Sequence, residues 1–353
     1  MSELLLSTIE MVKALDEGAM AEARLRQDRL TKPQGSLGRL EELSVQLAGI
    51  QGKPVPQIRH KAIITMAGDH GVVAEGVGNW PQEVTAQMIH NFLSGGAGIN
   101  ILARQVGARL VVVDMGVATE MEPNPKLLSR KVAFGTNDIS SGPAMTSERA
   151  VTAIETGIEI VAAEVAKGLD IVGTGDMGIG NTTASSAICA VITGESVSKV
   201  TGRGTGITDE QLRHKIDVVE RALAVNKPDP NQPLDVLAKV GGFEIGGLVG
   251  VMLGAAAHRV PVVIDGFISG AAALIATVLS PGLKDFLIAA HVSAETGHKS
   301  LLAHLGLNPL LNLGMRLGEG TGASLGIFLA EASARTLAEM STFPEAGVSE
   351  RKG

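Results

Sequence analysis

Short apolar runs that end at Gly, Asp or His recur along the middle of this chain, and helix-length segments separate them. The runs occupy residues 62–67, 110–113, 171–172, 260–264 and 286–290. The segments between them occupy residues 83–105, 147–167, 182–192, 209–225, 244–257 and 271–279. Strands that alternate with helices predict βαβ units and a mostly parallel sheet. Because the strands are apolar throughout, we expect an α/β fold with helices on both faces of the sheet.

Small and polar residues follow each of these predicted strands. The runs are followed by Gly68, Asp114, Gly173, Asp265 and His291. In open parallel sheets, ligands bind beyond the carboxyl ends of the strands. We therefore expect one long cleft that is assembled from the loops after these strands.

Both ends of the chain are predicted to be helical. Apolar residues recur at helical spacing up to about residue 51, and residues 322–340 form an alanine-rich helical stretch. We expect residues 1–55 and 325–353 to pack together as a small helical domain. Residues 56–324 then form a large α/β catalytic domain.

Composition excludes several classes of partner. The 353 residues carry a formal net charge of −7 and include 7 Phe, 1 Trp and no Tyr, which argues against a nucleic-acid partner. The single cysteine, Cys189, excludes an intrachain disulfide framework and a cysteine-based zinc site. It predicts a reducing compartment, the cytoplasm, and the N-terminus lacks the pattern of a secretory signal.

One uncharged stretch, residues 266–283, has the length of a candidate membrane span. It consists mostly of small residues, and Asp265 and Lys284 flank it closely. We interpret it as a buried helix and expect no membrane association.

The segment Gly173-Thr-Gly-Asp-Met-Gly-Ile-Gly-Asn-Thr-Thr183 follows a predicted strand and opens a predicted helix. Glycines at such a place let backbone N–H groups approach an anion, and the helix N-terminus favours negative charge. Gly173, Gly175 and Gly178 also match the dinucleotide fingerprint, but the motif lies in the middle of the chain. Glycines that serve packing alone, and a dehydrogenase that binds NAD here, remain alternative interpretations.

A second glycine-rich segment, Gly202-Arg-Gly-Thr-Gly206, precedes the predicted helix that carries Lys215. Alternating glycines before a helix are typical of anion-binding loops, and Lys215 could add a point charge for a phosphate. On spacing alone, an ordinary solvated helical lysine is the favoured interpretation of Lys215. The pattern of a P-loop is absent from the sequence.

Glu319 stands between glycines in Gly318-Glu-Gly-Thr-Gly322 and is the best candidate general base. Its small neighbours allow a substrate to approach the carboxylate, although a solvated loop carboxylate is the alternative. Asp69 and His70 follow the first predicted strand and could form an acid-base couple, or Asp69 could cap the loop. Together these loops suit group transfer from a phosphorylated small molecule, without a metal.

At these residues the chain resembles the nicotinate-nucleotide-dimethylbenzimidazole phosphoribosyltransferase family. The resemblance runs in order from near residue 30 to the C-terminus. The N-terminal matching segments are Thr31-Lys-Pro-Gln-Gly-Ser-Leu-Gly-Arg-Leu-Glu41, Ala67-Gly-Asp-His-Gly-Val72 and Pro81-Gln-Glu-Val-Thr-Ala-Gln-Met88. The others are Gly178-Ile-Gly-Asn-Thr-Thr183, Gly202-Arg-Gly-Thr-Gly206, Met315-Arg-Leu-Gly-Glu-Gly-Thr-Gly-Ala323 and Phe343-Pro-Glu-Ala-Gly-Val-Ser349.

The resemblance implies that nicotinate mononucleotide is the donor and 5,6-dimethylbenzimidazole the acceptor, with α-ribazole 5′-phosphate and nicotinate as products. It further implies inversion at the anomeric carbon, no metal or cofactor, a homodimer and a Rossmann-like large domain. Glu319 matches the family's catalytic base. The residues that we expect to bind substrates are Gln87, Asp176, Met177, Gly178, Gly180, Asn181, Gly202, Arg203, Gly204, Lys215, Asp265, Ser293, Leu317 and Gly318.

Within that set, Gln87, Met177 and Leu317 match the acceptor pocket, whereas the glycine loops, Lys215 and Ser293 match the ribose-phosphate and nicotinate side. Asp176 occupies a position that is commonly Glu in the family, and Trp80 is expected to reshape the acceptor pocket. Both departures leave open transfer to another base, such as adenine or a substituted benzimidazole. A nucleotide-binding module without turnover is a further alternative.

Overall fold

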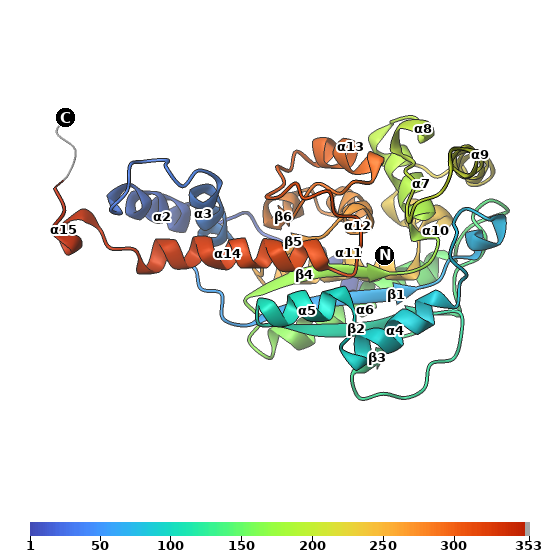
Figure 1. Ribbon diagram of the computed structural model, residues 1–353, viewed down its shortest axis with the longest axis horizontal. Coiled ribbons are helices and arrows are strands. Elements are labelled where there is room, and N and C mark those ends of the chain that lie inside the picture. The colour runs from blue at the N-terminus through green and yellow to red at the C-terminus, as the bar shows by residue number, and fades with distance from the viewer. Residues whose placement is uncertain (350–353) are drawn as a thin grey trace.

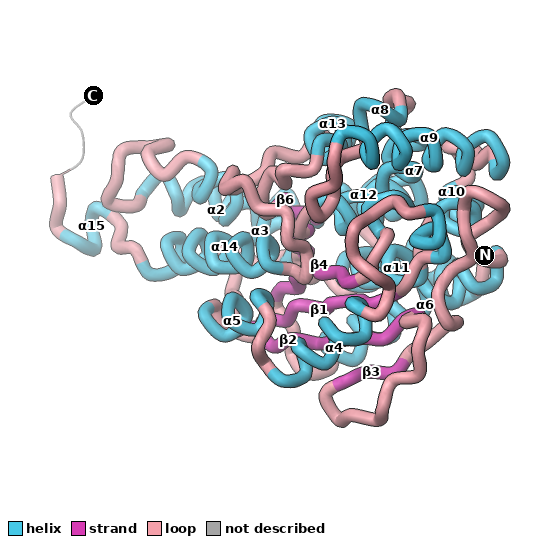
Figure 2. The backbone as a smooth tube through the Cα atoms, turned by 45° about the vertical axis from the view of Figure 1, so that its right-hand side comes forward, coloured by secondary structure: helices cyan, strands magenta, loops and turns pink. Residues whose placement is uncertain are grey.

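The structure of the protein is a computed structural model, which describes residues 1–349. Six strands in this part of the chain form one sheet with the order β3-β2-β1-β4-β5-β6, and every neighbouring pair is parallel. Figure 2 shows β3, β2, β1 and β4 side by side in this order. Their bounds are β1 (Lys61–Gly68), β2 (Ala108–Gly116), β3 (Leu127–Ser129), β4 (Ile171–Met177), β5 (Val262–Ile264) and β6 (Leu287–Ala289). This is the strand order of doubly wound nucleotide-binding sheets, so the predicted Rossmann-like α/β class is confirmed.

Helices cover both faces of the sheet, as the apolar strands predicted. The sheet separates two hydrophobic cores, one on each face. Side chains of β1 alternate between them: Ile64 and Met66 lie in the first core, and Ile63 and Ala67 lie in the second. The helices around the first core are α1 (Glu3–Met11), α6 (Ser147–Val165), α7 (Asn181–Thr193), α8 (Val197–Val200), α9 (Asp209–Asn226), α10 (Pro233–Val240), α11 (Phe243–Ala257), α12 (Phe267–Leu279) and α13 (Thr296–Leu305). Those around the second are α3 (Arg39–Gln51), α4 (Val84–Ser94), α5 (Gly98–Gln105) and α14 (Thr321–Glu339).

The helices of the two chain ends meet on α14. The first half of α14 packs on β4, β5 and α5, and its second half extends to α3 and α2 (Glu17–Arg29) (Figure 1). The Arg26 guanidinium donates hydrogen bonds to the carbonyls of Leu337 (2.6 Å) and Ala338 (3.0 Å). By contrast, α1 packs on α6 and α11. Thus α14 connects the sheet with the helices α2 and α3.

Several predicted elements differ in extent from those in the structure. The helix expected over residues 83–105 is two helices, α4 and α5, because Gly95 adopts φ 85° and ends α4. The edge strand β3 and the helices α8, α10 and α13 went unpredicted, since they are short or lack a clear apolar period. A short helix, α15 (Phe343–Ala346), follows α14 and begins at a capping box formed by Thr342 and Glu345.

The uncharged stretch that begins near Gly266 contains α12, which is almost wholly buried. This agrees with its interpretation as a buried helix. Among residues 1–349, no helix combines the length and the apolar character that crossing a membrane requires.

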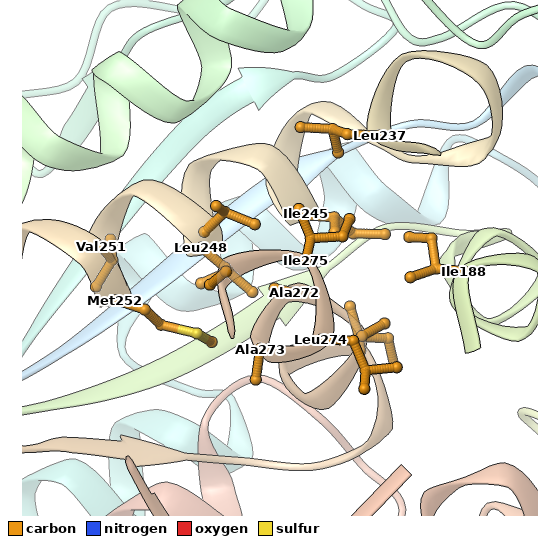
Figure 3. Packing of buried hydrophobic residues seen from close by; sticks show 14 of the residues in the cluster. Ile188, Leu237, Ile245, Leu248, Val251, Met252, Ala272, Ala273, Leu274 and Ile275 are labelled. Carbon is orange, nitrogen blue, oxygen red and sulfur yellow. The ribbon is translucent and has the colours of Figure 1, made fainter. Parts of the chain in front are cut away.

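Glycines bring α11 and α6 into close contact. A Cβ at Gly250 would lie 1.8 Å from the carbonyl oxygen of Ile154, and one at Gly157 would lie 2.0 Å from that of Gly247. On its other side α11 packs against α12, where Leu248 and Ala272 are among the side chains drawn in Figure 3. The sequence is rich in glycine here because any side chain would separate the two helix backbones.

This contact predicts that Gly250→Ala destabilises the protein. The added methyl group has no space against the α6 backbone, so the free energy of unfolding should fall by about 1–3 kcal/mol. Urea unfolding followed by circular dichroism measures the change. Gly282→Ala is the matched control, because nothing lies within 4 Å of a Cβ at that position. Equal stability of the two variants would contradict the proposed packing.

Candidate active site

Two adjoining cavities lie beyond the carboxyl ends of β1 and β4, where the strand order reverses. This is where doubly wound sheets bind ligands. The carboxylate cavity is lined by Asp176, Ser293, Glu295 and Leu317, among others. The lysine cavity is lined by Trp80, Arg203 and Lys215, among others. The residues that line both cavities are Gly178, Ile179, Asn181, Thr182, Gly204 and Thr205.

Glu319 lies in a tight loop next to the carboxylate cavity, and its backbone is held on three sides. It adopts φ 64°, a left-handed conformation that is uncommon outside glycine. Its N–H donates to the carbonyl of Asp176 (3.1 Å), and its own carbonyl accepts from the Thr65 hydroxyl (2.9 Å). A Cβ at Gly175 would lie 2.3 Å from that same carbonyl oxygen, so only glycine in β4 allows this approach.

The Glu319 side chain is buried, with 4% of its residue surface exposed. Its Oε2 accepts a hydrogen bond from the N–H of Ile99 (3.1 Å), in the first turn of α5. Burial raises the pKa of Glu319, although the Ile99 hydrogen bond opposes this effect. A buried carboxylate with a raised pKa suits a general base, so the interpretation as a solvated loop carboxylate was wrong.

Asp176 ends β4 beside this loop and is also buried. Its Oδ2 accepts from the Asn181 side chain (3.0 Å), while its Oδ1 has no hydrogen-bond partner within residues 1–349. Burial and the nearby carboxylates of Asp265 and Glu244 raise the pKa of Asp176 well above its usual value. The buried carboxyl of Asp176 therefore binds a proton more tightly than an exposed aspartate does.

Asp265 lies behind the same loop rather than in the walls of the two cavities. Its carboxylate accepts from the N–H groups of Ala323 (2.9 Å) and Gly320 (3.3 Å) at the start of α14. Burial raises the pKa of Asp265 to about 7, and these hydrogen bonds oppose the rise. The contacts assign Asp265 a positioning effect on the 318–320 loop.

Lys215 is buried beside the N-terminus of α7, so its interpretation as a solvated lysine was wrong. Its ammonium donates to the Thr182 hydroxyl (2.7 Å), and a Cβ at Gly204 would lie 3.6 Å from Nζ. Burial lowers the pKa of Lys215 to about 8, while the Glu295 carboxylate opposes this decrease. Together with the first N–H groups of α7, this ammonium can bind a phosphate.

The loop of residues 202–206 is held by arginines. The Arg203 guanidinium pairs with Asp209 and donates to the Ile207 carbonyl (2.8 Å). Arg316, from the loop before Glu319, donates to the Gly204 carbonyl (2.9 Å). Gly202 contacts the Glu295 carboxylate so closely that a Cβ there would lie 2.2 Å from its Oε2. The loop is thus fixed between the two cavities.

The dinucleotide fingerprint does not have the expected geometry. Gly173 and Gly175 lie within β4, not in the loop after it. A Cβ at Gly173 would lie 3.1 Å from the Ala323 Cβ, so this glycine allows α14 to approach the sheet. Only Gly178 and Gly180 are in the loop that lines the cavities.

Only some of the residues predicted to bind the acceptor line a cavity. Met177, Leu317 and Gly318 line the carboxylate cavity. Gln87 is exposed on α4 and lines neither cavity, although Thr85 of the same helix accepts from the Ile179 N–H (3.1 Å). Trp80 lines the lysine cavity, whereas Leu317 lines the carboxylate cavity, and the effect of Trp80 on the acceptor pocket stays a prediction.

Several groups at the site were missed or left undecided by sequence reasoning. His70 Nε2 lies 2.6 Å from Oε1 of Glu244, and both side chains are buried. Burial alone would lower the pKa of His70, but the Glu244 carboxylate raises it overall. Asp69 accepts from the Ala118 N–H (2.8 Å), which favours the loop-capping interpretation. No group of three His, Cys, Asp or Glu side chains suited to a metal ion occurs within residues 1–349.

Ser293 belongs to a turn that is closed by its own hydrogen bonds. Its N–H donates to Nδ1 of His298 (2.8 Å), and its hydroxyl accepts from the Glu295 N–H (3.2 Å). Because Nδ1 of His298 accepts a hydrogen bond, the imidazole is neutral, and burial lowers the pKa of His298 to about 3. The turn therefore fixes Ser293 and Glu295 in the cavity wall.

A buried carboxylate, glycine-rich loops beside a buried lysine and a doubly wound sheet suit a phosphoribosyltransferase. A family profile described as "Phosphoribosyltransferase" matches residues 12–348. The chain belongs to the nicotinate-nucleotide-dimethylbenzimidazole phosphoribosyltransferase family.

Similar proteins cover almost the whole chain. A relative of that name from Dehalococcoides mccartyi is 60% identical over 350 residues, 99% of each chain. One from a Roseiflexus species is 60% identical over 346 residues, 98% of each chain. A crystal structure of the enzyme of that name from Thermus thermophilus is 46% identical with a TM-score of 0.91, and the match covers 96% of this chain and 100% of that one.

The buried ammonium predicts a pH-dependent affinity for sulfate, an anion whose charge is constant above pH 7. Lys215 is charged below its pKa of about 8 and neutral above it, so sulfate affinity should fall by about tenfold or more between about pH 7 and pH 9.5. Isothermal titration calorimetry measures this change. Lys215→Met should bind sulfate weakly at both pH values. An unaltered pH dependence in that variant would assign the effect to another group.

Proposed function

We propose that this protein transfers the phosphoribosyl group of nicotinate mononucleotide to 5,6-dimethylbenzimidazole. The products are α-ribazole 5′-phosphate and nicotinate. The observation that carries the proposal is the buried Glu319 carboxylate beside the carboxylate cavity. This cavity adjoins the lysine cavity, which contains the buried Lys215 and the N-terminus of α7. Such an arrangement suits a base at one end and an anion at the other. The names of the relatives agree with this function.

The residues of the lysine cavity bind the donor in this proposal. The 5′-phosphate lies against Lys215, the 178–181 loop at the start of α7 and the 202–204 loop. Met177 and Leu317 provide apolar surface for the acceptor ring in the carboxylate cavity. Asp176, whose pKa is raised by burial, lies next to this ring in the wall of the same cavity.

Glu319 makes the acceptor nucleophilic. Its carboxylate takes the N–H proton of the benzimidazole, and the other ring nitrogen attacks C1′ of the ribose. The bond between C1′ and the pyridine nitrogen breaks, and nicotinate leaves with the bonding electron pair. Attack on the face opposite the leaving group inverts C1′. The 318–320 loop and the hydrogen bond from Ile99 keep the base in position.

Further features of the assembly are proposed with the function. A homodimer is supported by exposed apolar side chains on α5 and α14, Ile101 and Phe328. A cytoplasmic location is supported by the free thiol of Cys189. We further propose a division into a small helical domain, residues 1–55 and 325–353, and a large domain, 56–324. The packing of α2 and α3 on α14 supports it, whereas α1 packs on α6 and α11 of the large domain.

Product analysis tests the function directly. Purified protein is incubated with nicotinate mononucleotide and with dimethylbenzimidazole, adenine or a substituted benzimidazole. Mass spectrometry and anomer analysis by NMR should identify α-ribazole 5′-phosphate as the main product. A preference for adenine would correct the acceptor, and nucleotide binding without transfer to any base would favour a binding module.

Glu319→Gln should lower kcat by about 10² or more while nicotinate mononucleotide still binds, because the amide cannot accept the proton. In the wild type, kcat should fall as the pH decreases through the raised pKa of Glu319, since only the carboxylate is a base. The variant should lack this dependence. Glu159→Gln, on the exposed side of α6, is the matched control and should retain full activity. An unchanged kcat in Glu319→Gln would contradict the assignment of the base.

A further inference from the structure

Glu295 is a buried acid in the cavity wall to which the proposed reaction assigns no task. It stands at the N-cap position of α13, yet its side chain does not cap the helix. Only 7% of its surface is exposed, and its Oε2 has no hydrogen-bond partner within residues 1–349. That oxygen lies against Gly202, out of reach of a ligand, so a ligand group in the cavity that Glu295 lines would donate to the other carboxylate oxygen, Oε1.

The backbone around Glu295 is built to hold this carboxylate. The 293–298 turn is closed by the hydrogen bonds of Ser293 to Glu295 and His298. Opposite the turn, Gly202 has no side chain, and a Cβ there would lie 2.2 Å from the Glu295 Oε2. The carboxylate occupies the space that the missing side chain leaves.

Glu295 lies along the route between the two ends of the site. It lines the carboxylate cavity together with Leu317 and Gly318, which are next to the base. It is also near enough to Lys215 to raise the pKa of that lysine. A donor whose phosphate is at Lys215 and whose C1′ is near Glu319 would therefore place its ribose past Glu295.

The charge of Glu295 excludes a contact with the phosphate, because two anions repel each other. A carboxylate accepts hydrogen bonds, and the hydroxyl groups of the ribose are the donors that the nucleotide offers in this region. We propose that Glu295 accepts hydrogen bonds from the ribose 2′- and 3′-hydroxyls and selects ribonucleotides over deoxyribonucleotides. This inference rests on the proposed function, since it takes the nucleotide as the ligand.

The test compares Glu295→Gln with the wild type on nicotinate mononucleotide and its 2′-deoxy and 3′-deoxy analogues. For the wild type, kcat/KM should be about 10- to 100-fold lower with at least one analogue, as expected for a lost hydrogen bond to a charged group. In the variant this ratio should fall severalfold, because the neutral amide oxygen accepts a weaker hydrogen bond than a carboxylate. With the discriminated analogue the two proteins should differ less than with the ribonucleotide, because this contact is already missing, and the loss that both substrates share reports the effect of Glu295 on Lys215.

The alternative is that Glu295 acts only through Lys215, by keeping the lysine charged. Glu295→Gln would then weaken all three nucleotides equally and would weaken sulfate binding as well. That result would overturn the proposal, as would a wild type that accepts both analogues as readily as the ribonucleotide. Glu159→Gln, in the exposed part of α6, is the matched control and should keep the wild-type discrimination.

Failure of the proposed function is distinguishable from failure of this inference. If the wild type forms no product, equilibrium dialysis with the same three nucleotides measures the discrimination as a ratio of dissociation constants. If Glu295→Gln does not fold, as judged by its circular dichroism, Glu295→Asp replaces it. The shorter side chain keeps the charge but withdraws the carboxylate, so the discrimination should decrease while sulfate binding remains. Retained discrimination in Glu295→Asp would contradict the contact.

Discussion

The close approach of the 318–320 loop to β4 is the constraint on which the site depends. It needs glycine at position 175, where even a methyl group would overlap the Glu319 carbonyl. The same approach buries the Glu319 carboxylate and brings it to the first turn of α5, far from it in sequence. Burial then changes the proton affinity of the side chain. A steric requirement within a strand therefore determines the chemistry of a side chain in another part of the chain.

Buried charge is distributed unevenly across the site. Carboxyl groups gather on the side of the loop, where Asp176, Asp265 and Glu319 each have a raised pKa. The lysine side has a single buried ammonium, whose pKa is lowered. Burial thus shifts the carboxyl groups and Lys215 toward their uncharged forms. The affinity of each group for a ligand therefore depends on the charge of that ligand.

The sequence predicted a feature correctly where a single short segment contains all the residues that determine it. The apolar runs predicted the parallel sheet, and the glycines beside Glu319 predicted an approachable acid. It failed where the partner lies far along the chain. Lys215 is buried because α7 packs over it, and its partner Thr182 is 33 residues away. His70 and Glu244 are separated by 174 residues. Glycine residues are ambiguous in a similar way, because the same residue serves loops and close packing. The sequence predicted Gly173 and Gly175 in a loop, whereas both lie inside strand β4 and allow close packing.

The course of α14 has a mechanical consequence. Its 19 residues form a helix about 28 Å long, with the loop that carries Glu319 attached to one end and α2 and α3 packed on the other. A tilt of α2 and α3 would therefore be transmitted along this helix to the position of the Glu319 carboxylate.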